Sequence, residues 1–269
     1  KMLDLFSGIG GFSLAASWTG AIETVAFCEI EPYCQKVLQK NFPGILIHSD
    51  ITKLRGEDVG AVDIVCGGFP CQPFSNAGKR RGKEDDRYLW PELLRVIAET
   101  HPLWVIGENV TSLLNLGIKE MLLDLEDIGY RGGVFQIPAS AIGATFAGDR
   151  IYIVATSHSK QCYCLGENIK IKPTAQYQKM LRAWKAESCS LPLDLEGFFT
   201  DTGQRIERND DGLSKGLDRL KCIGNAVVPQ VVYPILQGIV EIEKAMEGEE
   251  SYAIQRLPTV SRKNSTPSQ

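Results

Sequence analysis

Residues 2–18 read MLDLFSGIGGFSLAASW, and this stretch decides the class of fold. The apolar segment at 2–6 predicts a short strand, the glycines at 8, 10 and 11 predict a loop, and the apolar spacing from 12 to 18 predicts a helix. Strand, glycine loop and helix in this order open a βα unit whose backbone N–H groups can face a ligand. The loop lacks the third glycine of the dinucleotide fingerprint, so on its own it also fits an ordinary tight turn.

Strand and helix patterns alternate along most of the remaining chain. Further strands are expected at 23–28, 45–48, 62–66, 103–106, 133–139 and 150–155. Helices are expected at 32–41, 90–100 and 118–128, and Pro229 and Gln230 are expected to open a last helix that runs through 232–246. This alternation predicts an α/β fold with a doubly wound, mainly parallel sheet. Periodicity weakens between 156 and 217. We therefore expect a main domain at 1–155 and 218–250, a small region inserted at 156–217, and a polar tail at 251–269.

Acidic residues follow several of the predicted strands. Glu29 lies at the tip of the second strand, roughly 20 residues after the glycine loop, where an acidic side chain can accept hydrogen bonds from ribose hydroxyls. Asp50 follows the third strand and could either cap the next turn or contact an adenine edge. Glu108 ends another buried strand, and Arg150 stands at the entrance of the last one. In open α/β sheets the carboxyl ends of the strands form the ligand-binding edge, so a cleft is expected there.

The stretch GGFPCQPFS at 67–75 places Cys71 between two prolines directly after a predicted strand. The prolines stiffen the backbone, and a thiol held at this edge is a plausible nucleophile. A buried structural cysteine is an equally good interpretation of this stretch alone. The segment that follows is polar and basic at 79–83, which fits a solvated surface or a closing loop that contacts phosphates.

Composition limits the classes of protein without choosing among them. The chain has 269 residues, 43% of them hydrophobic, which suffices for one large core and a smaller appendage. The net charge of −4 neither supports nor excludes DNA, so DNA contacts would need a local basic patch. Eight scattered cysteines without a preceding signal peptide favour a reducing, cytoplasmic setting. No metal site and no membrane-spanning segment are expected.

Five motifs in fixed order resemble the cytosine-5 DNA methyltransferase family. They are DLFSGIGGF at 4–12, GFPCQ at 68–72, ENV at 108–110, GDR at 148–150 and GNAV at 224–227. Each motif alone is weak to moderate, whereas the ordered set is specific and covers most of the chain. The resemblance implies a Rossmann-like catalytic domain that binds S-adenosylmethionine and releases S-adenosylhomocysteine, with target recognition by the region at 156–217.

The resemblance also implies roles for individual residues. The expected catalytic residues are Cys71, Glu108 and Arg150. The expected cofactor contacts are Phe6, Gly8, Gly10, Glu29, Ile30, Asp50, Ile51, Gly68, Pro70, Leu89, Asn225 and Ala226. The expected DNA contacts are Gln72, Ser75, Lys79, Arg80, Arg81 and Lys83.

The implied reaction is methyl transfer to carbon-5 of a cytosine that is flipped out of a specific duplex site, through a covalent Cys71 adduct. The implied partners are double-stranded DNA and a cognate restriction endonuclease that is not a stable subunit, in a restriction-modification or self-protection role. The protein is expected to be a monomer, associated with the nucleoid if the source is prokaryotic.

Two departures from the family pattern leave alternatives open. Gly148 stands where the family carries the middle arginine of Gln-x-Arg-x-Arg, and Ala226 replaces a serine. A catalytically weakened or inactive DNA-binding relative is therefore one alternative. An RNA cytosine methyltransferase is another, although Gln72 after Cys71 favours DNA. A cysteine enzyme of unrelated chemistry would need a base partner, and none of the three histidines stands at a recognisable triad position.

Overall fold

The computed structural model describes residues 1–70, 88–138, 149–158 and 226–255, with side chains to 247 in the last range. Its strands are β1 (Met2–Leu5), β2 (Thr24–Cys28), β3 (Leu46–His48), β4 (Ile64–Gly68), β5 (Trp104–Val110), β6 (Arg131–Pro138) and β7 (Asp149–Thr156). Its helices are α1 (Gly11–Thr19), α2 (Pro32–Asn41), α3 (Gly56–Val59), α4 (Trp90–Thr100), α5 (Leu113–Leu116), α6 (Ile118–Asp127) and α11 (Pro229–Gln255).

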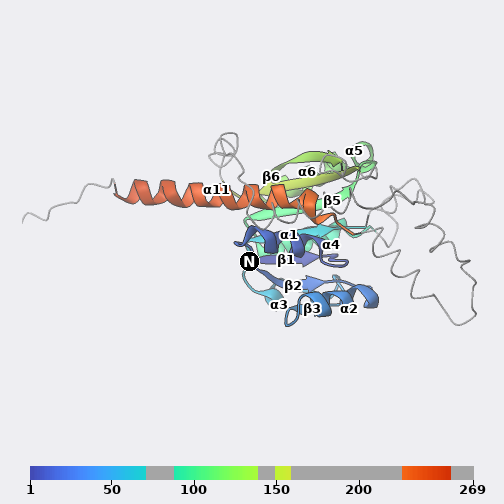
Figure 1. The fold of residues 1–269 in the computed structure, drawn as a ribbon. Helices are drawn as coiled ribbons and strands as arrows, with labels where there is room; N and C mark the ends of the chain where they lie inside the picture. The colour runs from blue at the N-terminus through green and yellow to red at the C-terminus, as the bar shows by residue number, and fades with distance from the viewer. Residues whose placement is uncertain (71–87, 139–148, 159–225, 256–269) are drawn as a thin grey trace, which may run out of the picture.

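The seven strands form one sheet in the order β3-β2-β1-β4-β5-β7-β6. The first five strands of this order are mutually parallel, and β7 runs antiparallel to both β5 and β6. The predicted mainly parallel α/β sheet is therefore confirmed (Figure 1). Strand β5 extends to Val110, beyond the predicted end at 106, because its last residues pair with the first residues of β7. Strand order reverses between β1 and β4, which marks the usual ligand-binding crevice.

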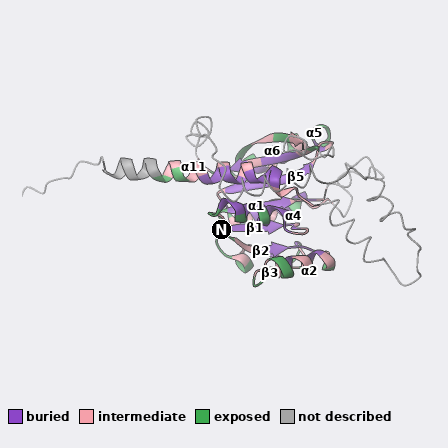
Figure 2. Ribbon diagram, viewed as in Figure 1, coloured by how far each residue is buried: buried purple, intermediate pink, exposed green. Residues whose placement is uncertain are grey.

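Side chains alternate between two cores, one on each face of the sheet. Leu3, Leu5 and Val65 face the core beneath α4 and α6, whereas Met2 and Ile64 face the core beneath α1 and α11. This period of two is what a strand buried on both faces requires, and it explains why the strands read as nearly continuous apolar runs. Figure 2 shows the buried residues concentrated in the central strands.

Helix α11 returns the chain to the first helix. Pro229 occupies its first turn, where a missing N–H costs nothing, and Val232, Tyr233 and Leu236 are buried against α1. The helix begins at Pro229, as predicted, and runs beyond the predicted 246, to Gln255. Among the described residues, no helix is long and apolar enough to cross a membrane. The division into a main domain, an inserted region at 156–217 and a tail stays a prediction, because 159–225 and 256–269 lie outside the described residues.

Candidate active site at the carboxyl edge of the sheet

Strands β1, β4, β5 and β7 bring the expected site residues to one edge of the sheet. Parallel pairing puts Leu5 beside Gly67 at the carboxyl ends of β1 and β4, and Gly68 beside Glu108 of β5. Because β7 is antiparallel, its first residues lie at this same edge, and Arg150 pairs with Val110. The topology therefore gathers residues that are far apart in the sequence. Figure 1 shows the strands of this edge side by side.

The loop after β1 turns through left-handed backbone conformations. Phe6 has φ 51°, Gly8 has φ 54° and Gly10 has φ 89°. A Cβ at Gly10 would lie 2.5 Å from the Phe42 ring, so this position requires glycine for space as well as for φ. A Cβ at Gly8 would meet nothing within 4 Å, so open space lies beside the loop where a ligand can approach the backbone.

Glu29 links the end of β2 to the glycine loop. One carboxylate oxygen accepts the Gly8 N–H at 2.7 Å and the other accepts the Glu31 N–H at 2.8 Å. The Gln35 amide donates to the Glu29 carbonyl at 2.6 Å. Each carboxylate oxygen keeps a further lone pair, so a held and largely buried Glu29 can still accept a hydrogen bond from a ligand hydroxyl. The next residue, Ile30, is 70% exposed and offers an apolar surface beside it.

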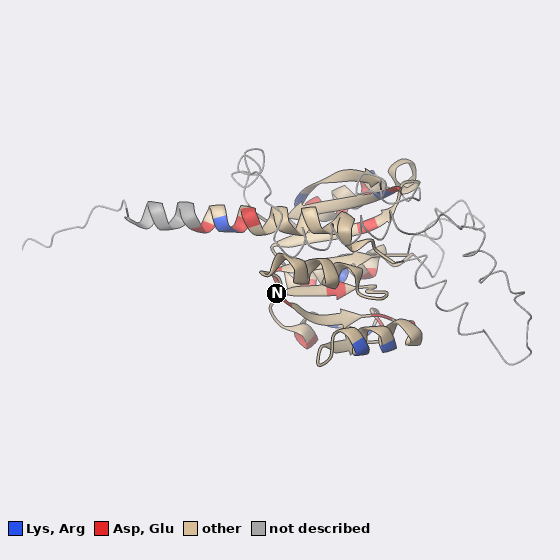
Figure 3. Cartoon of the chain, viewed as in Figure 1, with Lys and Arg blue, Asp and Glu red and all other residues tan. Residues whose placement is uncertain are grey.

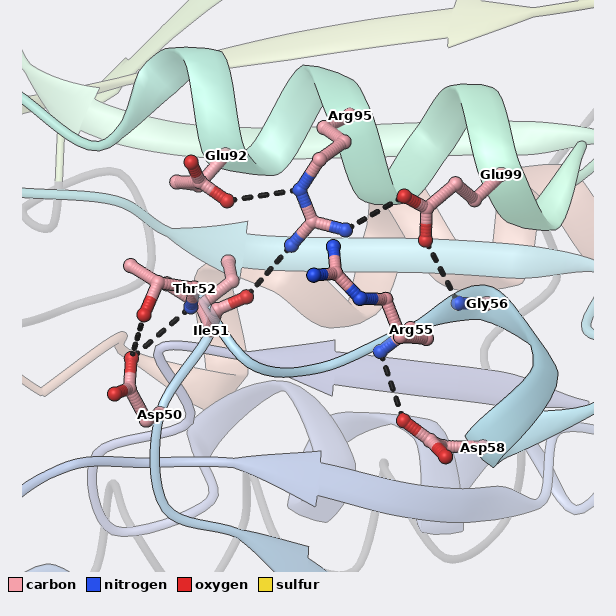
Figure 4. A network of polar contacts seen from close by, with 9 residues as sticks. All are labelled: Asp50, Ile51, Thr52, Arg55, Gly56, Asp58, Glu92, Arg95 and Glu99. Carbon is pink, nitrogen blue, oxygen red and sulfur yellow. Dashed lines mark hydrogen bonds and ion pairs between the residues drawn. The ribbon is translucent and has the colours of Figure 1, made fainter.

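The turn after β3 is built on Asp50. Its Oδ1 accepts the Thr52 N–H at 3.0 Å and the Thr52 hydroxyl at 2.7 Å, and these bonds lower the pKa of Asp50 (Figure 4). The structure thus shows the turn-capping role that the sequence left open. The second oxygen, Oδ2, lies 3.3 Å from Lys53 Nζ. The Ile51 side chain is buried in the core beneath α4, where Leu89, the N-cap residue of that helix, also packs.

Glu108 and Arg150 form an ion pair at the edge. Arg150 Nε lies 2.9 Å from Glu108 Oε1, and the Glu108 side chain is 11% exposed. Burial raises the pKa of Glu108 to about 7, against the lowering effect of Arg150. The second oxygen, Oε2, would lie 3.0 Å from a Cβ at Gly68, so the carboxylate stands directly over the end of β4. A carboxyl group with this pKa can hold or release a proton near neutral pH.

The sequence model of the C-5 cytosine-specific DNA methylase family matches residues 1–207. The chain belongs to this family. It is 39% identical over 159 residues to Type II methyltransferase M1.ScrFI of Lactococcus lactis subsp. cremoris, a match that covers 57% of this chain and 41% of that protein. It is 35% identical over 226 residues to Type II methyltransferase M.HgiBI of Herpetosiphon aurantiacus, covering 76% of this chain and 49% of that one. The chain thus spans less than half the length of these relatives.

A solved structure of similar fold is a mutant of Spodoptera frugiperda DNMT2. The likeness has a TM-score of 0.51 and 25% sequence identity, and covers 59% of this chain and 50% of that one. The family and the fold inferred from the five motifs are thereby confirmed.

Asn109 and Phe69 position the backbone of the site in this methylase-family chain, and the sequence did not predict this role for them. The Asn109 amide donates to the Phe69 carbonyl at 2.9 Å, and its oxygen accepts the Val110 N–H at 2.9 Å. Phe69 is buried against Trp90, with ring centroids 5.3 Å apart. These contacts fix the backbone immediately before Pro70. In the sequence, the position of the Asn109 amide directly after Glu108 was the one indication of such a role. The sequence could not show which backbone carbonyl this amide would reach.

Several expected site residues of this methylase-family chain fall outside the described residues. They are Cys71, Gln72, Ser75, Lys79, Arg80, Arg81, Lys83 and Asn225, together with Gly148. Ala226 is described and half-buried. The next residue, Val227, reaches the site. Its carbonyl oxygen would lie 2.3 Å from a Cβ added at Gly11, and its Cγ2 would lie 3.5 Å from a Cβ added at Gly68. Lys and Arg of the described elements are scattered in the view of Figure 3. The expected roles in cofactor binding, catalysis and DNA contact stay predictions.

Proposed function

We propose that this chain transfers a methyl group from S-adenosylmethionine to carbon-5 of cytosine in double-stranded DNA. The observation that carries the proposal is the Glu108–Arg150 pair, held at 2.9 Å over the end of β4, two residues before Pro70 and three before Cys71 in a chain of the C-5 cytosine methylase family. Because the chain spans under half of its curated relatives, this activity is proposed for the domain it contains.

The residues of the glycine-loop side fit the cofactor. Glu29 can accept hydrogen bonds from the ribose hydroxyls, and the exposed, apolar Ile30 can contact the adenine. The turn of Asp50 and Ile51 is the further proposed contact on the adenine side. Gly8 leaves open space beside the backbone, as a close approach by a ligand demands. Phe6, Gly10, Gly68, Pro70, Leu89, Asn225 and Ala226 complete the proposed set. Bound S-adenosylmethionine supplies an electrophilic methyl group.

Glu108 is proposed to hold a proton at the ring nitrogen of the target cytosine. With a pKa of about 7, the group is available in its protonated form near neutral pH. Attack on carbon-6 places electron density on the ring, and a proton held at the ring nitrogen stabilises that charge. Arg150 orients the carboxyl and can also hold the carbonyl oxygen of the base, since its guanidinium has donors beyond the Nε that contacts Glu108.

Cys71 is proposed as the nucleophile that attacks carbon-6. The step forms a C–S bond and turns carbon-5 into an enamine carbon that can accept the methyl group. Loss of the carbon-5 proton to solvent and elimination of the Cys71 thiolate, which takes the C–S electron pair, then restore the aromatic ring. These atoms are inaccessible in a stacked duplex, so the base must be flipped out. The basic segment at 79–83 would contact phosphates.

The biological setting is proposed from the names of the matched proteins. The curated relatives are called Type II methyltransferases, which favours DNA over RNA and a restriction-modification role alongside an endonuclease. We propose that the protein acts as a monomer on DNA in the cytoplasm, associated with the nucleoid if the cell is prokaryotic.

The test is covalent trapping on DNA. The protein is incubated with S-adenosylmethionine and duplexes that carry 5-fluorocytosine in many sequence contexts, and adducts are resolved on a denaturing gel and sequenced. Fluorine cannot leave as a proton does, so a working Cys71 stays attached. The adduct should disappear in Cys71→Ala and persist in Cys34→Ala, which removes a buried thiol of α2. Cofactor binding without any adduct would support a non-catalytic relative instead. A parallel incubation uses RNA that carries 5-fluorocytosine, and adducts on this RNA but not on the DNA would support an RNA methyltransferase.

A further inference from the structure

We propose that Arg95 is a positioning residue for cofactor binding, because its guanidinium holds the turn of Asp50 and Ile51 in place from helix α4. This inference rests on the proposed function and deepens it. Arg95 Nη2 donates to the Ile51 carbonyl at 2.7 Å across 44 positions of sequence. Figure 4 shows the side chain reaching from α4 toward this turn.

The turn needs an outside support. It follows β3, which has only three residues and lies at the edge of the sheet, with β2 as its one neighbour. Leu46 of that strand is 56% exposed. Within the turn, Asp50 accepts from Thr52, Lys53 and Leu54, and these bonds are local. The Ile51 and Leu54 side chains are buried in the core beneath α4, but apolar packing is non-directional and does not fix the backbone carbonyl and N–H groups of the turn.

Arg95 is itself held in one orientation. Its Nε lies 2.9 Å from Glu92 and its Nη1 lies 2.7 Å from Glu99, so all three guanidinium nitrogens have a described partner. The planar fork of arginine suits such a three-way arrangement, and the flanking carboxylates reduce the rotamer freedom that an isolated long side chain would lose. The side chain is 25% exposed, so these contacts are partly shielded from solvent.

Glu99 extends the support to the far end of the same segment. Its Oε2 accepts the Gly56 N–H at 2.8 Å while its Oε1 contacts Arg95. The segment from Ile51 to Gly56 is therefore attached to α4 at both ends, at a carbonyl and at an N–H (Figure 4). Helix α4 also carries Trp90, which packs on Phe69 beside Pro70. One helix thus supports both the proposed adenine side and the loop that leads to Cys71.

The test compares Arg95→Met with the wild-type chain in two ways. Hydrogen exchange without ligand should become roughly tenfold faster in a peptide spanning 49–56 and unchanged in a peptide of α1. Calorimetric binding of S-adenosylhomocysteine should weaken roughly tenfold, whereas kcat at saturating S-adenosylmethionine stays within about twofold. Arg95→Lys should give an intermediate affinity, because one ammonium cannot serve three partners. Arg131→Met, an exposed arginine of β6, is the matched control and should change neither readout.

A double-mutant cycle with Asp50→Ala separates positioning from general destabilisation. If Arg95 acts through the turn, the two substitutions together weaken binding little more than Asp50→Ala alone. Unchanged exchange at 49–56, or S-adenosylhomocysteine affinity within twofold of wild type in Arg95→Met, would overturn the inference. Multiplicative effects in the cycle would overturn it as well. Failure of the wild-type chain to bind S-adenosylhomocysteine would count against the proposed function, and the exchange comparison would still decide whether Arg95 positions the turn.

Discussion

Replacing Asp4 by asparagine should remove much of the pH dependence of folding stability. Asp4 is fully buried near the end of β1, where its Oδ2 accepts the Ser13 hydroxyl at 2.7 Å and its Oδ1 has no hydrogen-bond partner among the described residues. Burial is the largest cause that raises its pKa from 3.8 to about 7, and the charge of Glu29 adds to it. The Cys66 thiol faces it from β4, and burial with the Asp4 charge raises the pKa of that thiol well above its usual value.

The pKa of Asp4 in the unfolded and in the folded state determines how much the stability changes with pH and in which direction. An acid whose pKa is higher in the folded state binds more protons when folded, so stability falls as pH rises from about 4 to about 7. At 1.36 kcal/mol per pKa unit, the ionised carboxylate lowers the free energy of unfolding by about 4 kcal/mol above pH 8. About 3 kcal/mol of this loss falls between pH 5 and pH 8. An asparagine cannot ionise, but it adds an unpaired N–H donor that costs about 1–3 kcal/mol at every pH.

Urea unfolding at pH 5 and at pH 8 checks this prediction. The pKa of Glu108 is raised too, so Glu108 also makes the stability fall as pH rises, in wild type and in the variant alike. The difference in unfolding free energy between wild type and Asp4→Asn therefore isolates the contribution of Asp4. The variant should be less stable than wild type at pH 5, and it should recover about 3 kcal/mol relative to wild type by pH 8. An Asp4→Asn variant whose stability falls with pH as steeply as that of wild type would refute the reasoning.

Three further predictions concern the site. Arg150→Met should raise the pKa of Glu108 above about 7, because Arg150 lowers it. The alkaline limb of the pH profile of kcat/KM should then move to higher pH, and kcat should fall about 100-fold. Gly11→Ala should lower the free energy of unfolding by about 1–3 kcal/mol in urea, since its Cβ would lie 2.3 Å from the Val227 carbonyl, whereas Gly133→Ala meets open space and should cost little. Glu29→Gln should weaken S-adenosylhomocysteine binding roughly tenfold by calorimetry, without loss of the folded state.

The fold was predictable from the sequence because strands buried on both faces leave uninterrupted apolar runs. The run at 62–66 and the helix start at Pro229 show this directly, since burial and proline act locally. Strand ends were less predictable. The sequence placed the end of β5 near 106, but pairing with β7 carries it through Val110. Short helices such as α3 and α5 escaped prediction because four residues carry no periodicity.

The candidate site was predictable in its residue types and less so in its contacts. The sequence left Asp50 with two interpretations; the structure shows its capping bonds to Thr52, and its contact with an adenine edge stays a prediction. The Ile51 side chain is buried and its carbonyl accepts from Arg95, and its expected contact with the cofactor stays a prediction. A contact across 44 positions leaves no local pattern, so Arg95 was invisible to motif analysis.

The antiparallel β7 explains how distant motifs can serve one reaction. Were β7 parallel to β5, its first residue would lie at the amino edge of the sheet, and Arg150 would be separated from Glu108 by the length of the strand. Reversal of this one strand brings Arg150, its second residue, to the carboxylate near the end of β5, at 2.9 Å. The carboxylate is thereby buried and yet kept partly ionisable, because desolvation and the guanidinium shift its pKa in opposite directions. A sheet with a parallel β7 would leave Glu108 desolvated without its cation, and its pKa would then lie higher still.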